Sequence, residues 1–152
     1  MEPKIVRKDQ ITLVGMASYG GDIGRLWDAF TANDHLIAHT VGEVGYELHA
    51  YSKHSSPGDP IHIFVGVEVE KIENLSEIMF VKVLPACEYA VFTHRLADGG
   101  YEGANQPINQ WLENGPYERA YNFDLQVYDT RFKGPENPDS ELDFYIPVKP
   151  SK

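Results

Sequence analysis

The alternation of apolar and polar residues predicts a strand, a helix and two further strands in the first half of the chain. A strand near Ile11–Tyr19 precedes a helix that begins after Asp22, a residue type that favours the N-cap. Two strands follow this helix, Gly45–Tyr51 and Ile61–Glu70, and the second alternates strictly between apolar and other positions. The helix carries its apolar residues on one face, at i, i+3, i+4 and i+7: Ile23, Leu26, Trp27 and Phe30.

The second half repeats this order. A strand near Ile78–His94 is interrupted at Pro85, which has no backbone N–H to donate to a ladder. A helix is predicted to start near Asn105, with a proline in its first turn, and to stop before Gly115. Strands Ala120–Phe132 and Leu142–Val148 complete the half. The sequence therefore predicts that one strand–helix–strand–strand motif occurs twice.

The duplication is also visible in the residues. Tyr46–Tyr51 lines up with Phe123–Tyr128, and the strand around Phe64 lines up with the strand around Tyr145. We therefore predict an α+β fold of two pseudo-symmetric strand–helix–strand–strand modules. Each module contributes antiparallel strands and one helix, and a ligand cleft lies between them. Residues 1–152 are expected to form a single domain, with module one at about 4–71 and module two at about 77–149.

The central strands have one apolar face and one mixed aromatic and polar face. If each helix covers the apolar face, then Leu48, Leu125 and their alternating neighbours point at the helices. The mixed face has the composition of a ligand cleft, because a solvated face would carry more Lys and Glu and fewer rings. Trp27 and Trp111 lie on helical apolar stripes, typical of core packing, and are also candidates for the ligand site. The remaining predicted ligand residues are Glu47, His49, Tyr51, Phe64, Asp124, Gln126, Tyr128 and Tyr145.

The net charge and the absence of known catalytic motifs limit the classes of function that the chain can have. The chain carries 23 acidic against 13 basic residues, a formal net charge of -10, which argues against direct binding of nucleic acid and favours cationic ligands. No stretch has the roughly 18 apolar residues of a membrane span. The single cysteine, Cys87, and the lack of a signal peptide indicate the cytoplasm. Neither HExxH nor GxSxG occurs, so no catalytic residue, cofactor or metal is predicted. His35 and His39 are expected to lie in a loop, without a metal.

Five segments of the chain have a distinctive sequence: Ile23–Phe30, Leu84–Phe92, Trp111–Gly115, Leu125–Phe132 and Pro138–Lys149. Together they resemble the GyrI-like family. This is the effector-binding domain of AraC-type and MerR-type multidrug regulators, and it is related to a gyrase-inhibitor protein. The resemblance spans nearly the whole chain and is most specific after Val83.

The resemblance implies a hydrophobic cleft between two modules that binds small molecules. In multidrug members a glutamate in the cleft neutralises a cationic drug, and that position is Gln126 here. A glutamine orients a ligand by hydrogen bonds but supplies no charge. The ligand is then either cationic, with the counter-charge on Glu47, Glu68 or Asp124, or neutral. The regulators place this domain after a helix-turn-helix segment, whereas only about ten residues precede the first predicted strand here. The chain is therefore expected to be a freestanding multidrug-type binding module, related to transcription regulators.

Three alternatives stay open. Some GyrI-like proteins are small-molecule hydrolases, and Glu47, His49, Asp124 and Tyr128 carry suitable acid–base groups. A gyrase-inhibitor-like module with a separate protein partner is the second alternative. Haem binding, known in a distantly similar fold, is the third, although the histidines have no recognisable axial-ligand context.

Overall fold

The computed structural model describes residues 2–151, which form nine strands, two α-helices and two short 3-10 helices. Along the chain these are β1 (Lys4–Lys8), β2 (Ile11–Tyr19), α1 (Ile23–Asn33), η1 (Asp34–Leu36), β3 (Gly45–Ala50), β4 (His62–Glu68), β5 (Phe80–Leu84), β6 (Cys87–Arg95), η2 (Tyr101–Ala104), α2 (Asn105–Asn114), β7 (Tyr117–Arg119), β8 (Phe123–Tyr128) and β9 (Glu141–Pro150). The predicted repeat of strand, helix, strand, strand is present as β2-α1-β3-β4 and β6-α2-β8-β9.

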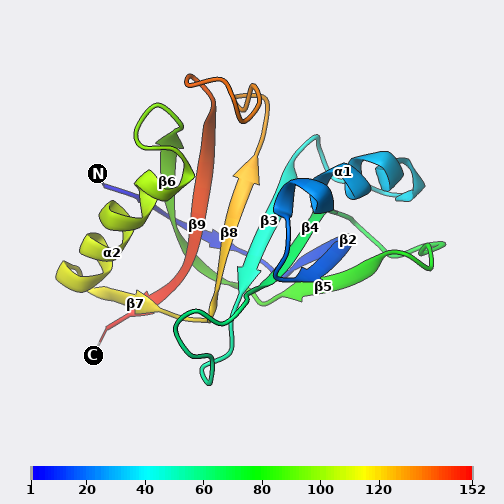
Figure 1. Ribbon diagram of the computed structural model, residues 1–152. Coiled ribbons are helices and arrows are strands. Elements are labelled where there is room, and N and C mark those ends of the chain that lie inside the picture. The colour runs from blue at the N-terminus through cyan, green and yellow to red at the C-terminus, as the bar shows by residue number, and fades with distance from the viewer. Residues whose placement is uncertain (1, 152) are drawn as a thin grey trace.

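All strands belong to one antiparallel sheet. Its order is β1-β6-β9-β8-β3-β4-β2-β5, with β7 paired to β9. The two modules meet in the middle, where β3 pairs with β8, and the helices lie on either side of this pair (Figure 1). The predicted antiparallel α+β architecture is confirmed, with the strands of both modules joined into a single sheet.

The register confirms the internal alignment of the two halves. Leu48 and Leu125, the residues matched by the sequence repeat, pair with each other across the β3–β8 ladder. Each also pairs outward with the matched residue of its own module, Leu48 with Phe64 and Leu125 with Tyr145. The pseudo-two-fold axis therefore passes through the Leu48–Leu125 pair.

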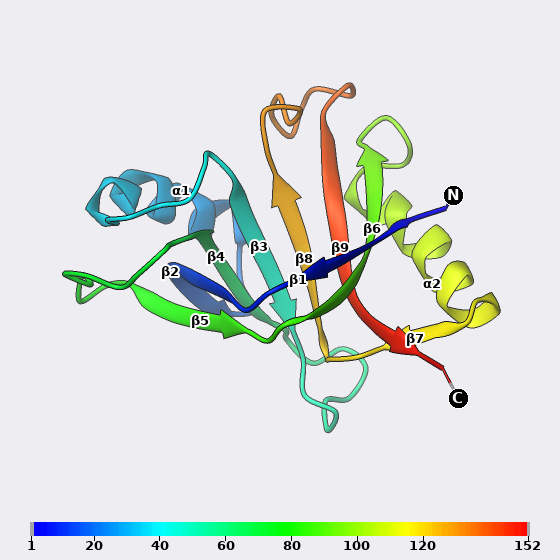
Figure 2. The ribbon, with the colours of Figure 1, turned by 180° about the vertical axis from the view of Figure 1, so that it is seen from behind.

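A second layer of strands closes the sheet on the side away from the helices. β1 continues into β2, and β5 continues into β6. β1 pairs with β6 and β2 pairs with β5 at the same offset, as Lys8↔Cys87 and Ile11↔Leu84 show. In Figure 2, which views the molecule from behind, β1 crosses in front of β9. The enclosed core contains buried side chains of all these strands, among them Ile11, Leu13, Leu48, Leu84, Cys87, Tyr89, Phe123 and Leu125.

Each helix packs on the outer strands of its module. In α1, Leu26 and Phe30 are buried against β2 and β4, and the Asp22 side chain accepts a hydrogen bond from the Arg25 amide, as the N-cap pattern predicted. In α2, Ile108 is buried against β6 and β9. The predicted start of α2 at Asn105 is confirmed.

Two short strands were missed, and one predicted strand was too long. β1 was not predicted, because charged residues interrupt its short alternation. β7 was not predicted either, because three residues give too little pattern. β8 stops at Tyr128, because the Asp129 carboxylate accepts from the Arg131 amide in a local turn that competes with the ladder.

The predicted orientation of the central strands was also wrong. Two rows of paired residues cross the sheet, and the helix-side row runs Phe92, Phe144, Gln126, Glu47, Val65. The apolar residues Leu48 and Leu125 point to the opposite face, into the core closed by β1-β2 and β5-β6. The sequence reasoning assumed that only a helix covers an apolar face, whereas here a second layer of strands does.

Candidate functional site

The helix-side row changes from apolar to polar at its centre. Phe92 and Phe144 pack with α2 at one end, and Val65 packs with α1 at the other. Between them Gln126 and Glu47 are register partners on β8 and β3. This polar pair lies in the strip of sheet between the two helices, close to the pseudo-two-fold axis. We define the central site as Glu47, Gln126 and the side chains that contact them.

Glu47 is the buried charge of the central site. Its exposed fraction is 5%, although a carboxylate loses much hydration free energy on burial. Its Oε1 accepts a hydrogen bond from the Trp27 indole N–H at 2.6 Å, and its Oε2 lies 2.6 Å from His49 Nε2. Within residues 2–151 no lysine or arginine lies within ion-pair distance of Glu47. The carboxylate is therefore held by an indole and an imidazole and has no arginine or lysine counter-charge.

Aromatic rings surround this carboxylate. The Trp27 indole lies over Gly45, where an added Cβ would be 3.2 Å from Trp27 Cη2, so a larger residue would push the ring away. Tyr128 meets the Trp27 ring edge-on, with centroids 5.7 Å apart. Phe132 packs against the other side of Tyr128 at 4.7 Å. Glycine at position 45 thus lets the first module place its tryptophan against the second module's tyrosine.

Gln126 is oriented by Tyr128. The Tyr128 hydroxyl donates to Gln126 Oε1 at 2.6 Å, which leaves the amide N–H groups of Gln126 free to face other acceptors. Burial, followed by the nearby Glu47 carboxylate and Tyr101, raises the pKa of Tyr128 well above its usual range. Tyr128 is therefore a neutral hydrogen-bond donor throughout the range in which proteins are stable.

The second module supplies its own carboxylate, Asp124, which is His49's register partner. Asp124 forms an ion pair with Arg119 of β7. Burial raises the pKa of Asp124, and the Arg119 charge and hydrogen bond and then the His49 charge act against this rise. Tyr51 lies near the same pair, and burial raises its pKa while Arg119 opposes the change. Asp124 is thus already neutralised by a residue of the protein.

The structure divides the predicted ligand residues into three places. It brings Trp27, Glu47, His49, Asp124, Gln126 and Tyr128 together between the helices, with Tyr51 at the Arg119 end of this group. Trp111 lies in the α2 core, stacked on Tyr117 at 5.5 Å. The placement of Phe64 and Tyr145 with this group was wrong, because they pair with Leu48 and Leu125 and so point to the other face. That the first group binds a ligand stays a prediction.

Three contributors were missed by sequence reasoning. Arg119 lies on the short strand β7, and Gly45 is one of 13 glycines with no distinguishing pattern. Tyr101 begins η2 after Gly99 and Gly100, which both have positive φ, and burial followed by the Glu47 charge raises its pKa. The Gly-Gly pair was the one available signal, since it marks a turn that sets the direction of the next residue.

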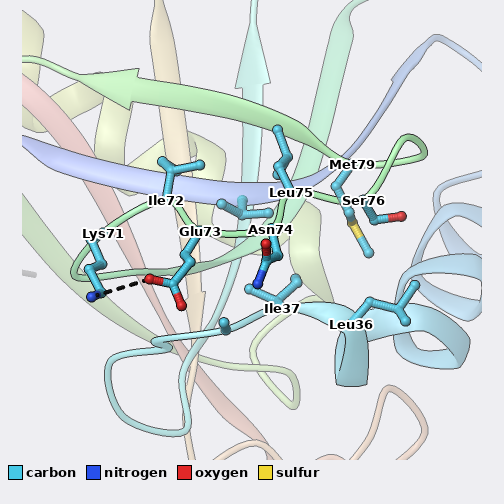
Figure 3. A pocket seen from close by; sticks show the side chains of 11 residues that line it. Leu36, Ile37, Lys71, Ile72, Glu73, Asn74, Leu75, Ser76 and Met79 are labelled. Atoms are coloured by element: carbon cyan, nitrogen blue, oxygen red, sulfur yellow. Dashed lines mark ion pairs between the residues drawn. The ribbon is translucent and has the colours of Figure 1, made fainter.

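Two cavities lie away from the central site. One is beneath the segment Lys71–Met79 and against Leu36 and Ile37, where Figure 3 shows the lining side chains and the Lys71–Glu73 ion pair. Its volume of about 10 Å³ holds no more than one water molecule. The other has a volume of about 400 Å³ and lies on the side opposite the helices, over Leu48 and Phe64. Glu47 and Gln126 line neither cavity.

The arrangement of the acidic and histidine side chains bears on metal binding, and the length of the helices bears on membrane insertion. Within residues 2–151 no group of three or more His, Cys, Asp or Glu side chains is arranged to hold a metal ion. His35 is part of η1, whereas His39 follows it with positive φ and pairs with Glu73 at 3.3 Å. Over the same residues, no helix combines the length and the apolar character needed to cross a bilayer.

One curated relative is similar over almost the whole chain. The transcriptional regulator BrlR of Pseudomonas aeruginosa is 36% identical over 155 aligned residues, which cover 97% of this chain. The alignment covers 56% of BrlR, so this chain spans about half the length of that regulator.

Solved structures share the fold at low sequence identity. The C-terminal domain of EcmrR matches with a TM-score of 0.74 and 11% identity, covering 99% of this chain and 98% of that one. SAV2435, solved with tetraphenylphosphonium bound, matches with a TM-score of 0.70 and 15% identity, covering 98% and 94%. These likenesses confirm the fold independently of close sequence similarity.

The family assignment rests on a match that spans nearly the whole chain. Residues 4–148 match the family described as "Cass2: Integron-associated effector binding protein", which includes both modules and the central strands. The resemblance to effector-binding domains seen in the sequence is thereby confirmed. The chain belongs to the Cass2 family of effector-binding proteins.

Proposed function

We propose that the chain binds a small aromatic cation in the central site, with Glu47 as the counter-charge. The observation that carries this proposal is a carboxylate with an exposed fraction of 5% and no lysine or arginine partner within residues 2–151. A buried carboxylate that has only an indole and an imidazole as partners is costly, and a cationic ligand adds the charge that arginine or lysine would supply. A ligand of this class is bound in a structural neighbour, since SAV2435 was solved with a phosphonium cation.

The position of the charge explains the departure at residue 126. The resemblance places the family's cleft glutamate at Gln126, and Glu47 is its direct partner on the neighbouring strand. In this chain the carboxylate therefore lies on β3, directly opposite the position on β8 where the resemblance places it. Trp27 and Tyr128 supply aromatic faces beside it, which attract a delocalised cation through stacking and cation–π interaction.

Ligand entry requires side-chain movement. Glu47 is nearly inaccessible, so a ligand reaches it only after the rings above it separate. Tyr101 is suited to this role because it is 37% exposed and follows Gly99 and Gly100, whose backbone rotates at little steric cost. Binding is then expected to be slower than diffusion and to change the environment of Trp27.

The test compares a cation with a neutral analogue. Tetraphenylphosphonium and triphenylphosphine oxide are titrated by calorimetry into the unmodified chain, Glu47→Gln and the matched carboxylate variant Asp124→Asn. Glu47→Gln is expected to weaken phosphonium binding by about thirtyfold or more, because a charge pair in a buried site is lost. Asp124→Asn is expected to change the affinity by less than about threefold, because Arg119 already balances that charge.

An exchange of the two residues guards against misfolding. Glu47→Gln combined with Gln126→Glu moves the carboxylate to the partner strand and should recover most of the phosphonium affinity. If the phosphonium and the neutral oxide bind the unmodified chain equally well, the cationic part of the proposal is wrong. If Glu47→Gln folds and binds the cation normally, Glu47 is not the counter-charge.

Hydrolysis is the second candidate, because of one contact. The 2.6 Å approach of His49 to Glu47 is the arrangement in which a carboxylate orients an imidazole for proton transfer. An enzyme of this kind would convert a reactive aromatic ester or epoxide, and turnover would be abolished by His49→Gln. A binding protein would return the same compounds unchanged and would bind them reversibly in stoichiometric amounts.

A further inference from the structure

The side opposite the helices carries an open groove. It lies between β2, β4 and β5, and its volume of about 400 Å³ falls within the usual range for small-molecule sites, about 300–1,000 Å³. Buried Leu48 and Phe64 are part of its lining, together with the small residues Ala17 and Ala50. The small side chains leave room that larger residues at the same positions would fill. We call this surface the back groove.

Two exposed aromatic side chains line the back groove. Tyr19 and Phe80 are 62% and 57% exposed, although both are large and have apolar ring faces. The Tyr19 ring is tilted against the His62 imidazole, with ring centroids 4.6 Å apart. Exposed rings that converge on one concavity are typical of a binding surface rather than of a solvated strand. A flat aromatic ligand fits this arrangement.

The ionisable groups of the back groove are basic. Lys82 and His62 line it, and none of its lining residues carries a carboxylate. Within the described chain Lys82 takes part in no ion pair. Glu68 lies in the same register row as Lys82, on the far side of Leu13, outside the groove. In a chain with a net charge of -10, this is a local reversal of sign.

We propose that the back groove is a second ligand site, which takes a small aromatic anion such as a carboxylate or sulfonate. The ring lies between Tyr19 and Phe80 over Phe64, and the anionic group meets Lys82 in a charge-assisted hydrogen bond. The site is separate from the central site, because the Leu48 row and the Glu47 row point to opposite faces of the sheet. The chain then accepts ligands of opposite charge on its two faces.

The test uses an aromatic anion with an optical signal. 8-Anilinonaphthalene-1-sulfonate is titrated into the unmodified chain, into Lys82→Glu, and into Lys133→Glu, which makes the same charge change at an exposed position elsewhere. Lys82→Glu is expected to weaken binding by about tenfold, and Lys133→Glu by less than about twofold. Ala17→Leu, at an exposed strand position, should fill the groove and weaken binding without unfolding the chain.

Four results would overturn the proposal. These are equal weakening by the two lysine variants, unchanged binding in Ala17→Leu, equal affinity for the cation 1-naphthylmethylammonium, and displacement of the sulfonate by tetraphenylphosphonium. The last result would place the anion in the central site. Loss of sulfonate binding at high protein concentration, together with dimer formation, would instead assign the groove to contact with a second copy of the chain.

Discussion

The two modules place a carboxylate at matched positions of the sheet but neutralise it in different ways. In the sequence repeat Glu47 of module one corresponds to Asp124 of module two. Asp124 has Arg119 as an ion partner, whereas Glu47 has the Trp27 indole and the His49 imidazole. The backbone symmetry is thus retained while the charge balance is not. The difference teaches that a duplicated backbone can hold one carboxylate by an arginine ion pair and its counterpart by an indole and an imidazole.

The largest expected effect is a loss of stability on truncating the paired core leucines at the pseudo-two-fold axis. Leu48 and Leu125 are 2% and 0% exposed and pair on the axis, so Leu48→Ala and Leu125→Ala should each lower the free energy of unfolding by about 3 kcal/mol. Urea denaturation followed by circular dichroism measures both. Leu36→Ala, at a 43% exposed position, serves as the control and should cost far less. A large difference between the two axial variants would show that the modules are not energetically equivalent.

An intermediate effect is expected from the Arg119–Asp124 pair. Arg119→Gln leaves a partly buried carboxylate without its cation, and it should reduce the free energy of unfolding by about 1–2 kcal/mol. Adding Asp124→Asn to this variant should recover most of the loss, since no charge then remains to be balanced. A double-mutant cycle by urea denaturation gives the coupling. Additive losses would mean that Arg119 stabilises the fold by packing alone.

The smallest effect is the pH dependence of Asp124. Burial raises its folded-state pKa above the ordinary value of 3.8, so the folded protein binds more protons than the unfolded chain just above that pH. The contribution of Asp124 to stability is therefore greatest at low pH and declines as the pH rises through the raised pKa.

Asp124→Asn should remove this decline and change the difference in unfolding free energy between pH 4 and pH 7 by less than about 1 kcal/mol. Thermal or urea unfolding at several pH values measures it. The exposed Asp139→Asn is the control and should leave the profile unaltered. If the Asp124 contribution to stability instead rose with pH, the effect of Arg119 on the pKa of Asp124 would outweigh that of burial.

Much of the frame was predictable from the sequence because it depends on local patterns. The apolar stripe of α1, its Asp22 cap, the start of α2 and the matched strands β3 and β8 all follow from periods of 3.6 and 2. The alternation also separated Glu47 and Gln126 from Leu48 and Leu125. These features need only neighbours along the chain.

Which face meets which layer was decided by the tertiary structure. Alternation assigns residues to two faces, but it does not say what covers each face, and here strands cover the apolar one. Phe64 and Tyr145 were misplaced for this reason, because the register between strands is a long-range property. The same long-range pairing sets Glu47 opposite Gln126 and Arg119 beside Asp124. The sequence by itself determined the repeated motif and its family, whereas long-range strand pairing decided which carboxylate has an arginine partner and which has only an indole and an imidazole.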